Sequence, residues 1–141
     1  MKGPDRKLIM IAANIFTALC AVLICFQLSL VLGAPLGHLT QGGFQTGTLP
    51  MAGRTMAALS GVILALMAFV VQRQARNRMH QRWPMWGVLG VTALTAFANI
   101  VTPSFWERAL WGPVATVMLA CAIHVWWHSP HPARAAQRHQ P

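Results

Sequence analysis

The chain has 141 residues, of which 55% are hydrophobic and 9% are charged, and its formal net charge is +9. Because a soluble domain usually has about 25% charged residues, this composition excludes an ordinary water-soluble domain. The basic residues lie in the gaps between apolar segments and not along one amphipathic face. That placement favours anionic lipid headgroups as their partner, so we expect no nucleic-acid binding.

Four apolar segments follow one another along the chain, at about residues 8–32, 50–71, 84–101 and 107–127. Each is close to the roughly 17–25 residues that cross the hydrocarbon core as a helix. A spanning segment must satisfy its own backbone hydrogen bonds in lipid, which here leaves helices. We therefore predict an all-α bundle of four transmembrane helices. Residues 1–128 would form this single domain, and residues 129–141 a disordered cytoplasmic tail.

The basic residues also predict how the bundle sits in the membrane. Nine basic residues lie in the N-terminal leader, in the connection between the second and third segments, and in the C-terminal tail. They are Lys2, Arg6, Lys7, Arg73, Arg76, Arg78, Arg82, Arg134 and Arg138. The opposite side holds only Arg54 and Arg108. The positive-inside rule then places both termini in the cytoplasm (N-in/C-in), in a multi-pass protein of the bacterial inner membrane. The connection between the second and third segments would bind anionic headgroups of the inner leaflet through Arg73, Arg76, Arg78 and Arg82.

Small or weakly polar residues recur at helical spacing in each segment and predict the faces that pack together. In chain order these are Asn14, Ala18, Ala21, Cys25 and Ser29; Ala57, Gly61 and Ala65; Thr92, Ala96 and Asn99; and Ala109, Pro113, Thr116, Ala120 and His124. Among them Asn14, Asn99 and His124 are the costly polar groups. Such residues either form hydrogen bonds between helices or mark a functional site, and we expect all three in the bundle interior.

All six tryptophans fall at predicted membrane borders, where an indole keeps its ring apolar and its N–H hydrated. They are Trp83, Trp86, Trp126 and Trp127 on the cytoplasmic side, and Trp106 and Trp111 on the outer side. We interpret them as interface anchors, with an aromatic cage for a ligand as the alternative.

The first outer connection, residues 33–49, contains five glycines, His38 and no formally charged residue. Within it, Gln41-Gly42-Gly43-Phe44 would turn a short hairpin, because paired glycines allow positive φ at both central positions. A connection of this length usually has a role. A loop so poor in charge is expected to fold down onto the bundle as a cap.

The second outer connection leads into the fourth helix with the spacing of a capping box. Ser104 and Glu107 would satisfy two N–H groups at the helix start. Arg54 lies in the first turn of the second helix, where the positive end of the helix dipole disfavours a cation. Our hypothesis is that Arg54 pairs with Glu107 across the outer face, or binds a lipid phosphate or another anionic ligand.

Two sets of short motifs on the outer side resemble those of a family of small, uncharacterised four-span bacterial integral membrane proteins. The first is Gly33-Ala34-Pro35-Leu36-Gly37 with Gly42-Gly43 and Leu49-Pro50; the second is Thr102-Pro103-Ser104-x-x-Glu107-Arg108 with Trp111-x-Pro113. The resemblance covers most of the chain and implies that the outer-face motifs belong together. It implies no particular activity.

Several classes of function fit this pattern to different degrees. A proton-coupled exporter is disfavoured because no segment has a carboxylate near its middle, although a transporter or channel subunit stays open. A haem or metal protein would depend on His124 and His128 at one helix end, and an enzyme that modifies lipids would depend on His38 with Glu107.

We favour a non-catalytic binding or accessory bundle without a cofactor, as a homo-oligomer or as part of a larger membrane complex. Its ligand, lipid or partner surface would lie on the outer (periplasmic) face. The candidate residues there are His38, Arg54, Asn99, Trp106, Glu107 and Arg108.

Overall fold

The computed structural model describes residues 4–79 and 81–129, and these are all-helical. Its elements are α1 (Pro4–Val31), η1 (Gly37–Leu39), η2 (Gln41–Gly43), α2 (Met51–Ala75), α3 (Trp83–Val101) and α4 (Phe105–His128). The four α-helices are each long and apolar enough to cross a membrane. The predicted fold class is therefore confirmed. Of the predicted tail, Ser129 closes α4 through its N–H to Val125 O at 3.0 Å, and residues 130–141 lie outside the described part.

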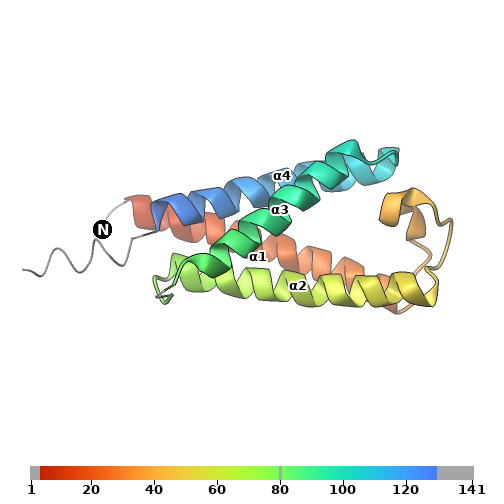
Figure 1. The fold of residues 1–141 in the computed structure, drawn as a ribbon, viewed down its shortest axis with the longest axis horizontal. Helices are drawn as coiled ribbons and strands as arrows, with labels where there is room; N and C mark the ends of the chain where they lie inside the picture. The colour runs from red at the N-terminus through yellow and green to blue at the C-terminus, as the bar shows by residue number, and fades with distance from the viewer. Residues whose placement is uncertain (1–3, 80, 130–141) are drawn as a thin grey trace, which may run out of the picture.

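The helices form an elongated bundle with two distinct ends (Figure 1). The start of α1, the 76–82 connection and the end of α4 lie at one end, which we call the arginine-rich end. The 32–50 loop and the 102–104 connection lie at the other, the glycine-rich end. α1 packs along α2 and α4, and α3 packs along α4. In contrast, α2 and α3 diverge from their short connection toward the glycine-rich end (Figure 1).

The ends of α1 and α2 are closed by the same left-handed turn. Gly33 has φ +92°, and its N–H donates to Leu30 O at 3.1 Å while that of Ala34 reaches Ser29 O at 2.9 Å. At the end of α2 the equivalent residue is Asn77, with φ +54°. These bonds are those of a Schellman motif, which satisfies the carbonyls that a helix leaves open at its C-terminus. Asparagine is the common substitute for glycine in this position.

The larger core cluster lies between α1, α2 and α4, with the start of α3, away from the glycine-rich end. Phe16, Cys20, Val71, Met85 and Val125 are fully buried in it. A smaller cluster of Leu30, Leu49 and Ala57 holds the start of α2 against the end of α1. Between membrane helices such packing is stabilised mainly by van der Waals contact.

The faces predicted from small residues are correct for α3 and wrong for α1 and α4. On α3, Thr92 and Ala96 are buried. On α1 the expected stripe is mostly exposed, and the helix instead buries Ile9, Ala12, Ala13, Phe16, Cys20 and Leu30. On α4 the buried residues are Gly112, Ala115, Met118, Ala122 and Val125. Both helices are apolar all round, so the position of small residues did not distinguish one face from the other.

Asn14 does not lie in an enclosed interior but at the exposed edge of the α1–α2 contact. Its Oδ1 accepts a hydrogen bond from Gln72 Nε2 at 3.0 Å, and the same Gln72 amide donates to Thr17 Oγ1 at 3.0 Å. This is an interhelical bond of the kind that holds membrane helices in register.

Candidate functional site

The loop between α1 and α2 folds over the glycine-rich end and is tied to the helices at three points. Trp111 Nε1 donates to Leu39 O at 2.7 Å, the Gly42 N–H donates to Glu107 Oε2 at 2.8 Å, and Gln41 Nε2 donates to Gly53 O at 3.1 Å. The predicted cap is thus present, because α4 supplies both a donor and an acceptor to the loop backbone.

The predicted hairpin in this loop is wrong. Gly42 and Gly43 have the expected positive φ, +80° and +73°, but both lie within the 3-10 turn η2. The Gly42 N–H is used by Glu107 and is not available to a strand partner. A Cβ on Gly43 would lie 2.7 Å from Ser104 Oγ, so the loop backbone approaches the start of α4 more closely than a side chain allows.

Glu107 completes only one half of the predicted capping box. Its N–H donates to Ser104 Oγ at 3.4 Å, as expected. Its carboxylate does not return to the N-cap; Oε2 instead accepts bonds from Gly42 N–H and from Thr102 Oγ1 at 3.3 Å. Oε1 accepts no hydrogen bond from any residue that the structure describes.

A cavity of about 340 Å³ lies beneath this loop, between the four helices. Its volume is within the range of about 300–1,000 Å³ that is typical of small-molecule sites. Thr40 of the loop is part of its lining. The helical lining residues are Leu23, Phe26 and Gln27 of α1; Ser60, Ile63, Leu64 and Met67 of α2; Val91, Thr92, Thr95 and Asn99 of α3; and Glu107, Trp111, Val114, Ala115 and Met118 of α4.

The cavity opens sideways where α2 and α3 diverge. The lining residues Ile63 of α2 and Val91 of α3 are 37% and 42% exposed, and Thr95 is also exposed. Both helices are long and apolar enough to span a membrane, and in a membrane this side would face the hydrocarbon chains.

The polarity of the cavity changes along the helix axes. Gln27, Asn99 and Glu107 lie near the glycine-rich ends of α1, α3 and α4, whereas Met67 and Met118 lie deeper in α2 and α4. With a rise of 1.5 Å per residue, Met118 is about 16 Å along α4 from Glu107. The lining is therefore that of an elongated site with a polar end and an apolar end.

Two aromatic rings form part of the wall near the polar end. Phe26 and Trp111 pack with ring centroids 4.7 Å apart and a tilt of 53° between their planes. Trp111 is one helical turn from Glu107, so both side chains lie on the same face of α4. Trp111 was predicted as an interface anchor; it instead lines the cavity and holds the loop.

Arg54 does not pair with Glu107 in this structure. Its Nε donates to Leu49 O at 3.0 Å, and its guanidinium lies against Gly33 at the C-terminus of α1. That end of α1 carries the negative end of the helix dipole, where a cation is favoured. The unfavourable position of Arg54 in its own helix is thus offset by the neighbouring helix.

The other candidate residues lie in different surroundings. Asn99 lines the cavity, half-buried, and its Nδ2 donates to Thr95 O at 2.8 Å. His38, Trp106 and Arg108 are exposed at the glycine-rich end; Arg108 Nη1 donates to Thr102 O at 3.2 Å. No hydrogen bond or ion pair joins His38 to Glu107 among the described residues. The His38–Glu107 pair that a lipid-modifying enzyme would use as a general base is therefore not formed in the part of the chain that the structure describes.

Sequence reasoning did not find Phe26, Gln27, Thr40 or Thr95 as parts of the site. The i, i+4 spacing of Glu107 and Trp111 is the signal that could have placed Trp111 beside the carboxylate. The contribution of Thr40 depends on how the loop folds, and its sequence does not specify that.

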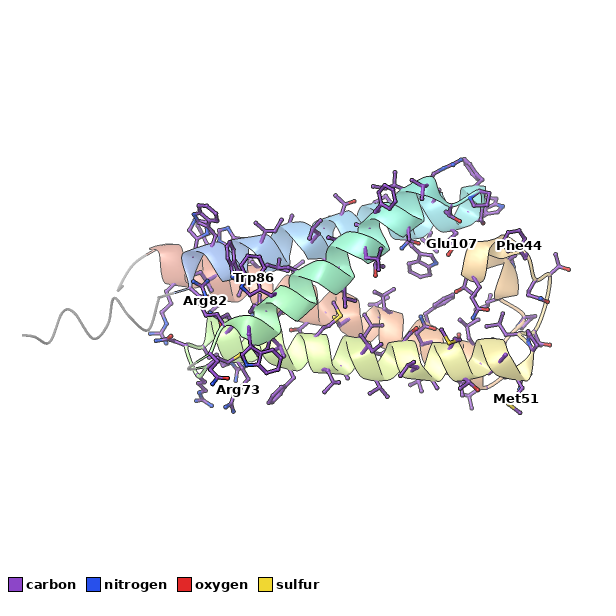
Figure 2. All side chains as sticks on the ribbon, in the orientation of Figure 1. Phe44, Met51, Arg73, Arg82, Trp86 and Glu107 are labelled. Atoms are coloured by element: carbon purple, nitrogen blue, oxygen red, sulfur yellow. The ribbon has the colours of Figure 1, made fainter. Side chains whose placement is uncertain are left out.

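The arginine-rich end carries cations against aromatic rings, and Figure 2 shows Arg73 and Arg82 at this end, opposite Glu107. Arg73 lies 5.5 Å from the ring centroid of Phe69, and Arg82 lies 5.2 Å from that of Trp126 and donates a hydrogen bond to Trp126 O. Burial lowers the pKa of Arg82 from its usual value. Arg76 and Arg78 are exposed.

His124 is half-buried near the same end, and its ring stacks on that of His128 with centroids 4.3 Å apart. Within the described residues, no group of three or more His, Cys, Asp or Glu side chains is placed to hold a metal ion.

No family model, curated protein or solved structure matches the chain. The resemblance to small four-span bacterial membrane proteins therefore stays a prediction.

Proposed function

We propose that this protein is a multi-pass protein of the bacterial inner membrane that binds an amphiphile in the cavity without changing it chemically. Its termini would lie in the cytoplasm and its glycine-rich end on the periplasmic side. The distribution of basic residues supports this orientation, because nine of the eleven Lys and Arg residues fall on the side of the termini.

The cavity is the observation that carries the proposal. It has a polar end beneath the loop, an apolar end deep between the helices, and an opening between α2 and α3. In the proposed orientation the polar end lies at the level of the outer-leaflet headgroups. An amphiphile that enters from the lipid would therefore keep its head and its chain in matching surroundings.

The arginine-rich end supports the proposal by providing an anchor. Arg73, Arg76 and Arg78 would lie at the inner-leaflet headgroups, each contributing about 1 kcal/mol near an anionic surface. Neither this role nor the binding role requires a catalytic group. We therefore describe the bundle as an accessory or binding protein. A native-mass measurement after gentle extraction gives its oligomeric state.

Photolabelling in lipid nanodiscs tests the binding proposal. Three probes share a dodecyl chain with a diazirine near its end and differ in their heads, which are an ammonium, a hydroxyl and a sulfate. We expect at least one probe to label cavity residues such as Leu64, Met67 or Met118, as mapped by mass spectrometry.

Two tryptophan substitutions on α3 provide a matched pair for this experiment. Thr95→Trp fills the cavity from its open side, whereas Ala98→Trp adds the same ring at an exposed position outside the lining. We expect the first to abolish cavity labelling and the second to preserve it. Labelling by no probe, or labelling that spreads evenly over lipid-facing residues and is unaffected by Thr95→Trp, would show that the cavity is not a binding site.

A further inference from the structure

We infer that the cavity selects its amphiphile by charge and takes a single hydrocarbon chain with a cationic, hydrogen-bond-donating head, such as a primary ammonium. This inference rests on the proposed binding function and specifies its ligand class. It is carried by the charge and the hydrogen-bonding capacity of the described residues around the polar end.

The first step is the charge of the lining. Among the described residues that line the cavity, Glu107 alone has a formal charge. The nearby cations are directed elsewhere, since Arg54 donates to Leu49 O and Arg108 donates to Thr102 O. A carboxylate beside an apolar cavity is stabilised by an opposite charge, and an anionic head would meet repulsion there.

The second step is that one carboxylate oxygen of Glu107 can accept a hydrogen bond from a ligand. Both of its hydrogen bonds, from Gly42 N–H and Thr102 Oγ1, go to Oε2. Oε1 receives none from the described residues. An ammonium head could therefore bind Oε1 without displacing the bond that holds the loop.

The third step is that several donors of the lining are already used. The Trp111 N–H donates to Leu39 O, the Asn99 amide N–H to Thr95 O, and the Ser60 hydroxyl to Met56 O. The Thr92 hydroxyl donates to Val88 O. Asn99 Oδ1 accepts no hydrogen bond from the described residues. Beside the Gln27 amide and the Thr40 hydroxyl, which can donate or accept, the polar end offers Glu107 Oε1 and Asn99 Oδ1 as acceptors for the N–H groups of a head.

The fourth step is the aromatic wall. The packed rings of Phe26 and Trp111 lie beside the carboxylate in the lining. The faces of aromatic rings attract cations, and tryptophan does so most strongly. The wall and Glu107 therefore favour the same head group, while the apolar residues toward Met118 accept its chain.

The three dodecyl probes test this inference through their ranking. For the unmodified protein in nanodiscs we expect the ammonium probe to label the cavity at about one tenth of the mole fraction that the hydroxyl probe needs. The sulfate probe should be the weakest. Equal labelling by all three heads, or a preference for the sulfate, would overturn the inference and leave the binding proposal intact. Labelling by none would refute the binding proposal itself.

A substitution assigns the preference to its residue. Glu107→Gln keeps an acceptor for Gly42 and removes the charge, so the ammonium and hydroxyl probes should become equivalent while cavity labelling persists. Arg76→Gln, which removes one charge from an exposed residue at the arginine-rich end, should keep the ranking. A Glu107→Gln protein that retains the full preference would contradict the inference. If that variant does not fold, the ranking on the unmodified protein still decides.

Discussion

Gly42 and Glu107, 65 positions apart in the chain, are joined by a hydrogen bond of 2.8 Å from the backbone N–H to the carboxylate. The bond connects the tip of the glycine-rich loop to the first turn of α4. Glu107 therefore has two tasks at one place, since it holds the cover of the cavity and contributes charge to the lining.

Removing the Glu107 carboxylate should release the loop. A hydrogen bond to a charged group stabilises by about 1.5–3 kcal/mol. Because Glu107 is partly exposed, we expect the free energy that holds the loop to fall by an amount at the lower end of this range. We expect Glu107→Ala to increase amide hydrogen exchange of residues 37–48 about tenfold. Arg108→Ala, at the exposed next position, should leave that exchange nearly unchanged. An unaltered exchange pattern in Glu107→Ala would show that the bond does not hold the loop.

The backbone at Gly43 should not accept a side chain. Gly43→Ala combines a φ of +73° with a Cβ that would lie 2.7 Å from Ser104 Oγ. The left-handed conformation alone costs about 1–2 kcal/mol for an alanine. The free energy of unfolding in mixed micelles should fall by at least that amount. Gly87→Ala, at a helical position with nothing within 4 Å of the added Cβ, is the control and should be neutral or slightly stabilising. Equal effects would contradict the observed loop geometry.

Arg54 should stabilise the contact between the end of α1 and the start of α2. Arg54→Gln removes the favourable charge at the C-terminus of α1, worth about 0.3–1 kcal/mol, and the donor to Leu49 O. We expect a loss of roughly 1 kcal/mol in the same unfolding measurement. Arg76→Gln, an exposed arginine on the other end, should change stability by less than about 0.5 kcal/mol. A stability gain in Arg54→Gln would indicate that its position in α2 dominates.

Gln72 and Asn14 should be energetically coupled across α1 and α2. A double-mutant cycle with Gln72→Leu and Asn14→Leu should give a coupling of about 0.6 kcal/mol, the average for interhelical hydrogen bonds in membranes. Because Gln72 Nε2 also donates to Thr17 Oγ1, Gln72→Leu alone should cost more than Asn14→Leu. Strictly additive effects would show that the bond contributes nothing to packing.

The proposed orientation predicts where reporters fused to the connections become active. A periplasm-dependent phosphatase fused at Gln45 should be active, and a cytoplasm-dependent fluorescent protein fused at Asn77 should be bright. The physical basis is the excess of Lys and Arg beside the termini and in the second connection. Phosphatase activity at Asn77, or fluorescence at Gln45, would reverse the bundle in the membrane and move the polar end of the cavity to the inner leaflet.

The helices were predictable because hydropathy along the chain is a one-dimensional signal. The observed bounds Met51–Ala75 and Trp83–Val101 differ from the predicted spans by four residues at most. Packing faces were harder to predict. Lipid and protein interior are equally apolar, so hydrophobicity does not tell whether Phe16 or Val22 of α1 turns inward. Of the predicted small-residue positions, Ala57, Thr92 and Ala96 are buried, whereas most of those on α1 and α4 are exposed.

The site was predictable where a polar residue stands out in an apolar segment. Glu107 and Asn99 were identified in this way and both line the cavity. Trp111 was misplaced because an indole at a membrane border usually serves as an anchor, and its bond to Leu39 O depends on a loop that has no regular periodicity. Trp106, selected for the same site, is 63% exposed and packs on Phe105.

The divergence of α2 from α3 has a consequence for how occupancy must be measured. An amphiphile that enters between α2 and α3 never leaves the bilayer, so it reaches the protein by two-dimensional diffusion. Its saturation is then governed by mole percent in the leaflet and not by molarity in the buffer. Adding lipid at a fixed total concentration of probe should lower the occupancy of the cavity, whereas diluting the sample with water should not.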